Sequence, residues 1–408
     1  MDHSMFLAKL IMNNKKYITR NFFYFFIFLF IGRFLYPLGD EPDFFLKASK
    51  VIKNIDDYNG PLNRNTDVYS YFRFLFDHLS ENVYCTIKSS PMSLFAQIDY
   101  KTCSDHLNNS LIRFFLSSCY LLLIIVPFFF DKSYFFLKKI GINLSFHEWN
   151  LRREILSLSI ILPSMIYYLG ILSNEQVTLA LSLLLFLLRQ SKHLSTVLIF
   201  MILLIDVGSG LMVLFYYVFI SIILYFYRYF YYWLFFFLFS FLILLFFRED
   251  LFNFISNYIP YIGEIFYNSK EFSKDVKEKY PVILRPVITY LSFIFLTPAK
   301  IKIIPLYIIF SFYLILFFFK TFKKISTNTK INLKNKFYFQ NTLIFFSSIY
   351  FIISIVVIMP SYAFAKYYIF ITPFFLYSII SVYDFKKICK FFVLCNILVF
   401  LNLLIYYI

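Results

Sequence analysis

Charged residues are scarce in this sequence, and their scarcity excludes an ordinary soluble domain. Only 15% of the 408 residues are charged, whereas soluble domains carry about 25%. By contrast, 60% are hydrophobic and 24% are aromatic. Apolar runs occur at 22–31, 111–130 and 303–319, and a hydrocarbon layer about 30 Å thick requires a run of about 20 residues. The sequence therefore predicts that lipid surrounds most of the chain.

Motifs for metals and soluble cofactors are also missing. The five cysteines form no CxxC or Cys/His metal spacing. No Walker loop, HExxH, GxSxG or DxD nucleotide-sugar motif stands in a segment expected on the cytoplasmic side. We therefore expect no metal, no cofactor and no soluble nucleotide as energy source. Cys85 and Cys103 share a polar segment, where a disulfide and two free thiols fit the sequence equally well.

The basic residues lie in short clusters between apolar runs and not along one face, although the net charge is +16. This distribution argues against nucleic acid as a partner and, under the positive-inside rule, marks cytoplasmic segments. One cluster precedes the first run and another follows the second: Lys9, Lys15, Lys16 and Arg20, then Lys132, Lys138, Lys139, Arg152 and Arg153. We expect a cytoplasmic N-terminus and an uncleaved first helix, because no small-residue cleavage site follows it.

The predicted fold is all-α, a polytopic transmembrane bundle of about 10 to 11 spans that forms a single integral membrane domain over 1–408. Two long outer loops, 38–108 and 248–302, are expected to carry short interfacial helices. Segment 288–302 is predicted to be re-entrant or interfacial, since a span there would place the basic region 320–336 outside. The other spans are expected at about 20–37, 109–130, 154–172, 177–188, 194–205, 211–227, 229–247, 303–319, 341–359 and 367–383, before a final C-terminal helix.

Three carboxylates, Asp40, Glu41 and Asp43, stand where the first helix leaves the membrane. Partial desolvation at a membrane surface raises the pKa of an acid toward the range of a general base, and such an acid can meet a lipid-linked substrate. The alternative is a solvated helix start with Asp40 as N-cap. The two interpretations are compatible.

Asp206 lies in a glycine-rich break, 206–210, between two short apolar helices. Ionisable groups near the membrane are functional by default because burying them is costly. The alternative is a loop-tip aspartate in a tight turn with Gly208 and Gly210.

Five cations stand near the outer ends of predicted helices, where they suit a diphosphate or serve as interface anchors. They are Arg33, Arg113, Arg248, Arg285 and Lys366.

Several segments resemble the bacterial oligosaccharide repeat-unit polymerases, which include O-antigen polymerases. The resemblance lies in 172–188, 194–205, 208–211 and the pair Tyr216 and Tyr217. Segment 365–370 is similar to the Arg-x-x-Tyr-Tyr-Phe segment of that family, with Lys366 in place of the arginine. The chain differs from the family at 174–176 and 206–210, where the family carries Arg-Gln-Ser-like and His-Ser/Gly-like residues. The acids after the first helix also resemble those of GT-C glycosyltransferases.

This resemblance implies a GT-C-like enzyme in the bacterial inner membrane. It would transfer a growing glycan from undecaprenyl diphosphate to a sugar hydroxyl of another lipid-linked unit at the periplasmic face. Asp40 or Asp43 would deprotonate the acceptor, and Arg248, Arg285 or Lys366 would stabilise the departing diphosphate. The expected partners are undecaprenyl-diphosphate-linked oligosaccharides, membrane lipids and a chain-length regulator protein. A GT-C enzyme that adds one sugar from polyprenyl phosphate, and a flippase or transporter, remain alternatives.

The three acids are tested one at a time by Asp40→Asn, Glu41→Gln and Asp43→Asn. A general base contributes about 10²- to 10⁴-fold to the rate, so the amide at the true base should abolish long glycan chains on a polysaccharide gel. Asp57→Asn, in the same loop, serves as the matched control. Full-length glycan from all three variants would exclude the carboxylate role.

Overall fold

A computed structural model describes residues 17–32, 121–125, 131–139, 145–171, 174–189, 191–247, 336–358, 366–380 and 385–407, with some single positions between them. Every element in these ranges is helical. The predicted first outer loop lies outside the described residues. The second outer loop and the spans predicted at 109–130 and 303–319 are described only at scattered positions.

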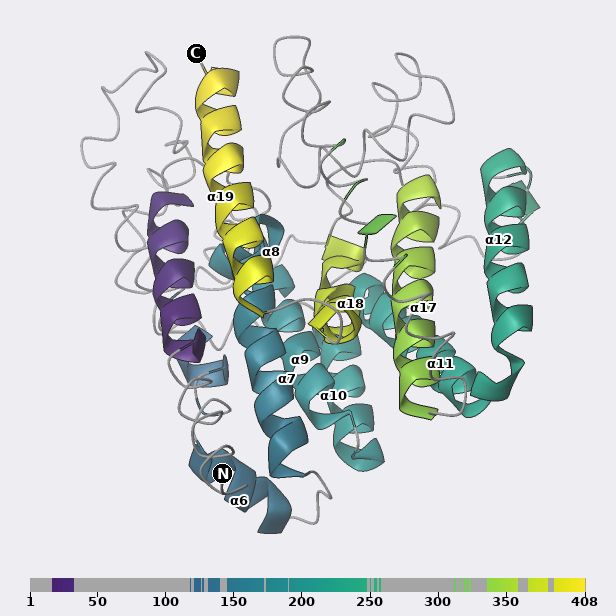
Figure 1. The fold of residues 1–408 in the computed structure, drawn as a ribbon, viewed down its shortest axis with the longest axis horizontal. Coiled ribbons are helices and arrows are strands. Elements are labelled where there is room, and N and C mark those ends of the chain that lie inside the picture. The colour runs from purple at the N-terminus through teal and green to yellow at the C-terminus, as the bar shows by residue number, and fades with distance from the viewer. Residues whose placement is uncertain are drawn as a thin grey trace, which may run out of the picture. The chain divides into compact units, whose positions relative to one another are not determined.

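The elements that the structure describes are all helices (Figure 1). They are the helix Tyr17–Gly32, α6 (Asp131–Lys139), α7 (Phe146–Ser159), α8 (Pro163–Gly170), α9 (Asn174–Leu188), α10 (Lys192–Ile205), α11 (Val207–Tyr225), the 3₁₀ turn η4 (Tyr227–Tyr229), α12 (Phe230–Phe246), α17 (Lys336–Ile358), the 3₁₀ turn η7 (Ile369–Ile371), α18 (Thr372–Ile380) and α19 (Phe385–Tyr407). They fall into two compact units, Met1–Val213 with Ile388–Ile408, and Leu214–Lys387.

The single helix predicted over about 154–172 is wrong, because the chain divides there into α7 and α8. Pro163 is the first residue of α8; it has no N–H to donate and it disfavours helical geometry at the residue before it. Leu162 is accordingly extended, with φ −60° and ψ 134°. Helix α7 also begins earlier than predicted, because the side chain of Ser145 caps it by accepting a hydrogen bond from the N–H of Glu148.

The helices predicted at about 177–188, 194–205, 211–227, 229–247 and 341–359 are confirmed as helices, namely α9, α10, α11, α12 and α17. The helix predicted at about 367–383 is divided and shorter: η7 comes first and α18 ends at Ile380. Pro373 stands in the first turn of α18, where its missing N–H leaves no helical bond unmade.

Helix Tyr17–Gly32, α7 and α19 pack together in the first unit (Figure 1). The side-chain amide of Asn21 donates to the Ser157 hydroxyl at 3.1 Å, and its oxygen accepts from the Cys389 thiol at 3.3 Å. Farther along the same helices, the rings of Phe28 and Phe400 lie 5.9 Å apart between centroids. Buried polar and aromatic contacts therefore join these three helices.

Buried side chains satisfy the carbonyls that the helix break and helix end leave without a partner. The amide of Asn396 on α19 donates to the carbonyl of Ile161, in the break between α7 and α8, at 2.6 Å. The amide of Gln176 on α9 donates to the carbonyl of Leu169, near the end of α8, at 2.7 Å. Each bond fixes an irregular backbone segment to a neighbouring helix.

Helices α10 and α11 approach each other closely at Gly210. A Cβ at this position would lie 2.6 Å from the Cα of Leu203, a backbone atom that cannot move aside cheaply. Glycine at 210 therefore permits the close approach of the two helices.

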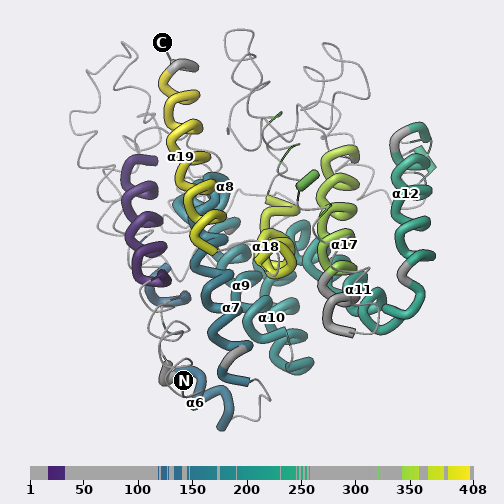
Figure 2. Tube along the Cα trace, viewed as in Figure 1, coloured from purple at the N-terminus to yellow at the C-terminus, as the bar shows by residue number. Residues whose placement is uncertain are grey.

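The second unit is held by apolar packing among α11, α12 and α17. Ile223, Phe237 and Leu343 form a buried cluster, and the ring of Phe237 stacks on Tyr350 with 4.9 Å between centroids. The chain turns at η4 between α11 and α12 (Figure 2). The Trp233 indole donates to the Phe226 carbonyl across this turn at 3.2 Å.

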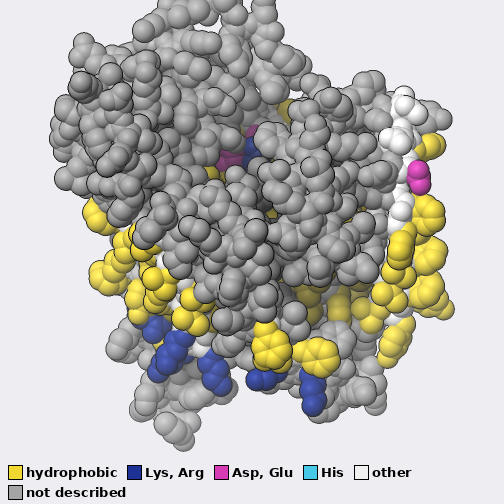
Figure 3. All heavy atoms as spheres, turned by 90° about the horizontal axis from the view of Figure 1, so that it is seen from above, with side chains coloured by type: hydrophobic (Ala, Val, Ile, Leu, Met, Phe, Trp, Pro, Cys, Tyr) yellow, Lys and Arg dark blue, Asp and Glu magenta, His cyan; other side chains and the backbone are white. Residues whose placement is uncertain are grey.

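Among the described residues, two helices are long and apolar enough to cross a membrane, Val207–Tyr225 with 19 residues and Phe385–Leu404 with 20. In these helices, 33% of the first span is buried and 50% of the second. Hydrophobic side chains also cover most of the described surface that Figure 3 shows.

Candidate functional site

Asp206 is the only non-helical residue between α10 and α11. One carboxylate oxygen accepts from the Gly208 N–H at 3.0 Å and the other from the Ser209 hydroxyl at 2.6 Å. The Asp206 backbone is extended, and its carbonyl accepts from the Gly210 N–H at 2.9 Å. These contacts are those of an N-cap, so both carboxylate oxygens hold the first turn of α11.

The contacts give Asp206 the role of a helix cap, which neither the functional-acid nor the loop-tip interpretation of the sequence predicted. Gly208 and Gly210 do not form the predicted break but lie in the first turn of α11. A catalytic role for Asp206 stays a prediction, since its side chain is half-buried and keeps an accessible edge.

Lys366 is partly exposed and lies just before η7. Its ammonium group is 5.6 Å from the centroid of the Tyr367 ring, within the range of a cation–π contact. Tyr368 beside it is buried. The Lys366 ammonium group therefore lies over an aromatic ring. Its contact with a diphosphate stays a prediction.

Tyr216 on α11 is the centre of an aromatic cluster in the second unit, and only 1% of it is exposed. Its ring makes edge-to-face contacts with three phenylalanine rings, Phe351, Phe370 and Phe374, at centroid distances of 5.2, 5.7 and 5.1 Å. The contact with Phe370 joins two segments that resemble the polymerase family although they are far apart in sequence. Tyr216 and 365–370 therefore belong to one packed region.

The hydroxyl of Tyr216 lies 2.9 Å from that of Ser348 on α17. The Ser348 hydroxyl also lies 2.6 Å from the carbonyl of Ile344, and either hydroxyl can be the donor in the pair with Tyr216. Sequence analysis missed Ser348. The signal available was the pair Ser347 and Ser348 in an otherwise apolar stretch.

No protein-family model, curated protein or solved structure matches this chain. The reading of its function therefore depends on the residues themselves.

The remaining predicted site residues lie outside the described residues: Arg33, Asp40, Glu41, Asp43, Arg113, Arg248 and Arg285. Asp206 and Lys366 belong to different units and are described separately. The described structure thus places two of the nine predicted residues and adds Tyr216 and Ser348 to them.

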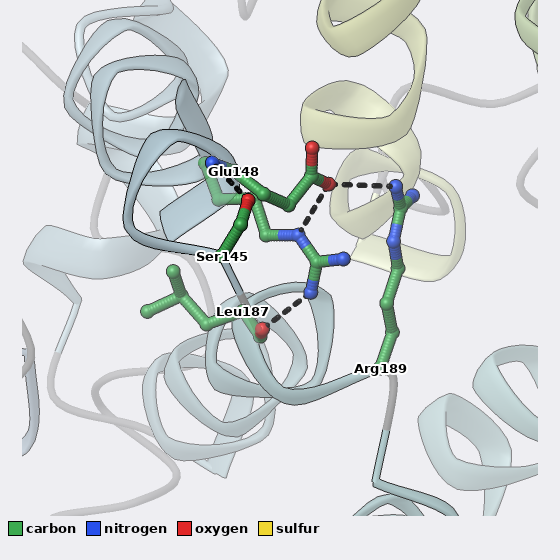
Figure 4. Close-up of polar contacts among 5 residues, drawn as sticks. Ser145, Glu148, Leu187 and Arg189 are labelled. Atoms are coloured by element: carbon green, nitrogen blue, oxygen red, sulfur yellow. Dashed lines mark hydrogen bonds and ion pairs between the residues drawn. The ribbon is translucent and has the colours of Figure 1, made fainter. Parts of the chain in front are cut away.

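A further polar cluster, of which the sequence singled out only Arg152 as one of the basic residues, links α7 to the end of α9 (Figure 4). The buried Arg152 donates through Nε to Glu148 at 3.0 Å and through Nη1 to the Leu187 carbonyl at 2.7 Å. Arg189 also forms an ion pair with Glu148, at 3.7 Å. Arg152 thereby satisfies a terminal carbonyl of α9 and places positive charge at the negative end of its dipole. The cluster is structural.

Asp206→Asn and Asp206→Ala separate capping from catalysis. Asparagine caps as well as aspartate, whereas alanine costs about 0.5–2 kcal/mol of helix stability. If Asp206 only caps, Asp206→Asn should retain both the thermal unfolding midpoint and the glycan product, and Asp206→Ala should lower the midpoint. Loss of product with an unchanged midpoint in Asp206→Asn would instead assign the carboxylate to the chemistry.

The Tyr216–Ser348 bond is tested by a double-mutant cycle. Tyr216→Phe and Ser348→Ala each remove one partner of a buried hydrogen bond, at a cost of about 1 kcal/mol. The double variant should lose less than the sum of the two single losses, measured by reversible thermal unfolding in detergent. Ser221→Ala, at an exposed serine of the same helix α11, is the control and should change stability little. Strict additivity of the two losses would contradict the bond.

Proposed function

We propose that the chain is a polytopic, GT-C-like protein of the bacterial inner membrane with a cytoplasmic N-terminus. Helix α12 supports the membrane location most strongly. Ser240 is the only residue among its 17 that is neither apolar nor aromatic, and a helix that is hydrophobic on all sides belongs in a protein core or in lipid. Tyr232, Phe235 and Leu238 are 75%, 67% and 61% exposed, so a protein core is not their environment.

The serines of α11 and α12 also suit a lipid environment. Ser240 donates to the carbonyl of Phe236, and the exposed Ser221 donates to the carbonyl of Tyr217 at 2.7 Å. In a hydrocarbon layer no water satisfies a hydroxyl, so the partner must come from the same helix or from a neighbour. Both hydroxyls have such a partner within their own helix.

We further propose that the protein is an oligosaccharide repeat-unit polymerase of the O-antigen type. The observation that carries this proposal is the packing of Tyr216 against Phe370, because it brings together two of the segments in which the chain resembles these polymerases. If the matches to these polymerases arose by chance, the matching segments would not be expected to pack against each other in the fold. The contact supports the activity only through that resemblance. The groups that react are the acids and cations predicted at the outer ends of the helices.

In the proposed reaction, Asp40, Glu41 or Asp43 removes the proton of an acceptor sugar hydroxyl. The hydroxyl oxygen then forms a bond to the anomeric carbon of the donor glycan, and the bond from that carbon to the diphosphate oxygen breaks. The diphosphate departs with the electron pair, and Arg33, Arg113, Arg248, Arg285 or Lys366 stabilises its charge. The donor and acceptor are both carried on undecaprenyl diphosphate.

Product length tests the activity. Purified protein in liposomes with undecaprenyl-diphosphate-linked repeat units should yield a ladder of products on a gel. One added sugar would instead identify a single-sugar transferase, and movement of the lipid between leaflets without a new linkage would identify a transporter.

Lys366 offers a matched pair of variants in the same assay. Lys366→Arg restores the residue of the family segment and should retain the ladder, whereas Lys366→Gln removes the charge and should shorten or abolish it. Equal ladders from both variants would remove Lys366 from the reaction.

A further inference from the structure

One face of helix α6 packs against the start of α7. Tyr134 and Leu137, three residues apart and so on the same side of α6, are both buried. The Tyr134 ring makes an edge-to-face contact with Phe146, the first residue of α7, at 5.1 Å between centroids. Figure 1 shows α6 running obliquely to α7. This contact therefore fixes α6 at the end of α7, not along its middle.

The other face of α6 combines two exposed rings with two exposed cations. Phe135 and Phe136 are 65% and 64% exposed, and Lys138 and Lys139 in the last turn are exposed as well. No ion pair joins either lysine to a carboxylate in the described part of the chain. The proposed function uses none of these four residues.

Neither water nor the centre of a bilayer suits this exposed face. In water the two rings keep apolar surface that burial would remove, whereas in hydrocarbon the two ammonium groups are costly. The boundary between headgroups and acyl chains suits both kinds of side chain. Rings can enter the acyl region there, while the long lysine stems carry their charges to the phosphates.

We propose that Phe135, Phe136, Lys138 and Lys139 dock α6 on the anionic lipid surface of the cytoplasmic leaflet. The oblique course of α6 at the end of α7 suits a helix that lies on a membrane surface. The sequence predicts that this lysine cluster is cytoplasmic, and anionic lipids of that leaflet attract basic segments. This inference rests on the proposed membrane location but not on the proposed polymerase activity.

The test measures amide hydrogen exchange of segment 131–139 by mass spectrometry, with the protein reconstituted into nanodiscs. Exchange should be slower in phosphatidylglycerol than in phosphatidylcholine, by about fivefold for each lysine that reaches the surface. Docking slows exchange because the helix must leave the surface before its amides open. Higher ionic strength should reduce the difference between the two lipids, because salt screens exposed charges.

Two double variants separate the cations from the rings. Lys138→Gln with Lys139→Gln should abolish the difference between the two lipids. Phe135→Ser with Phe136→Ser should speed exchange in both lipids, after correction for intrinsic exchange rates, because the contribution of the rings does not depend on headgroup charge.

Lys386→Gln with Lys390→Gln is the matched control. It removes two exposed lysines from α19 and should leave the exchange of α6 as it is in the wild type.

Two results would overturn the inference. One is equal exchange of wild-type α6 in both lipids, which would leave this face for a protein partner. The other is a lipid difference that persists in Lys138→Gln with Lys139→Gln. Wild type that enters nanodiscs and gives either result would sink this inference and leave the proposed function standing, whereas protein that does not enter nanodiscs would overturn the membrane location as well.

Discussion

The first unit depends on one constraint: each backbone carbonyl that a helix leaves behind inside it needs a donor from a neighbouring helix. The break before Pro163 exposes the carbonyl of Ile161, which takes the Asn396 amide. The ends of α8 and α9 leave Leu169 and Leu187, which take Gln176 and Arg152. An unmade bond at such a buried carbonyl costs about 1–3 kcal/mol. Asn396, Gln176 and Arg152 therefore cross-link neighbouring helices in this unit.

The second unit is stabilised differently, mainly by contacts between aromatic side chains. Tyr216 contacts three phenylalanines and bonds to Ser348, while Phe237 and Tyr350 stack between α12 and α17. Edge-to-face aromatic pairs fix orientation as well as burial. In lipid the apolar surface of a helix gains nothing from leaving the solvent, so shape and ring geometry decide how such helices pack. A composition rich in phenylalanine supplies the ring contacts that such packing in lipid needs.

The proposed polymerase depends on the second of these patterns, because segments distant in sequence meet at Tyr216 and Phe370 in the aromatic region. The hydrogen-bond rule of the first unit explains Arg152, since both its carboxylate and its carbonyl partner come from the protein.

Hydrophobic periodicity and run length were sufficient to predict the helices α9 to α12 and α17, because each is a nearly uninterrupted apolar run between polar or glycine-containing junctions. They were insufficient at 160–162, where a single proline ends a helix that composition would continue. At Asp206 the sequence allowed a functional acid or a loop-tip aspartate, and only the positions of Gly208 and Ser209 in the structure showed that it caps a helix. Ser348 was missed for the same reason, since its partner Tyr216 is distant in sequence.

The sequence by itself determined that the described chain is helical and which stretches are apolar enough to become helices, because both follow from local composition and spacing. Only the tertiary structure decided which polar side chain donates to which carbonyl and that Asp206 is bonded as a cap. Those outcomes depend on contacts between residues as far apart as Asn21 and Cys389. No local pattern encodes such contacts, because a hydrogen bond between helices forms only after the helices have packed.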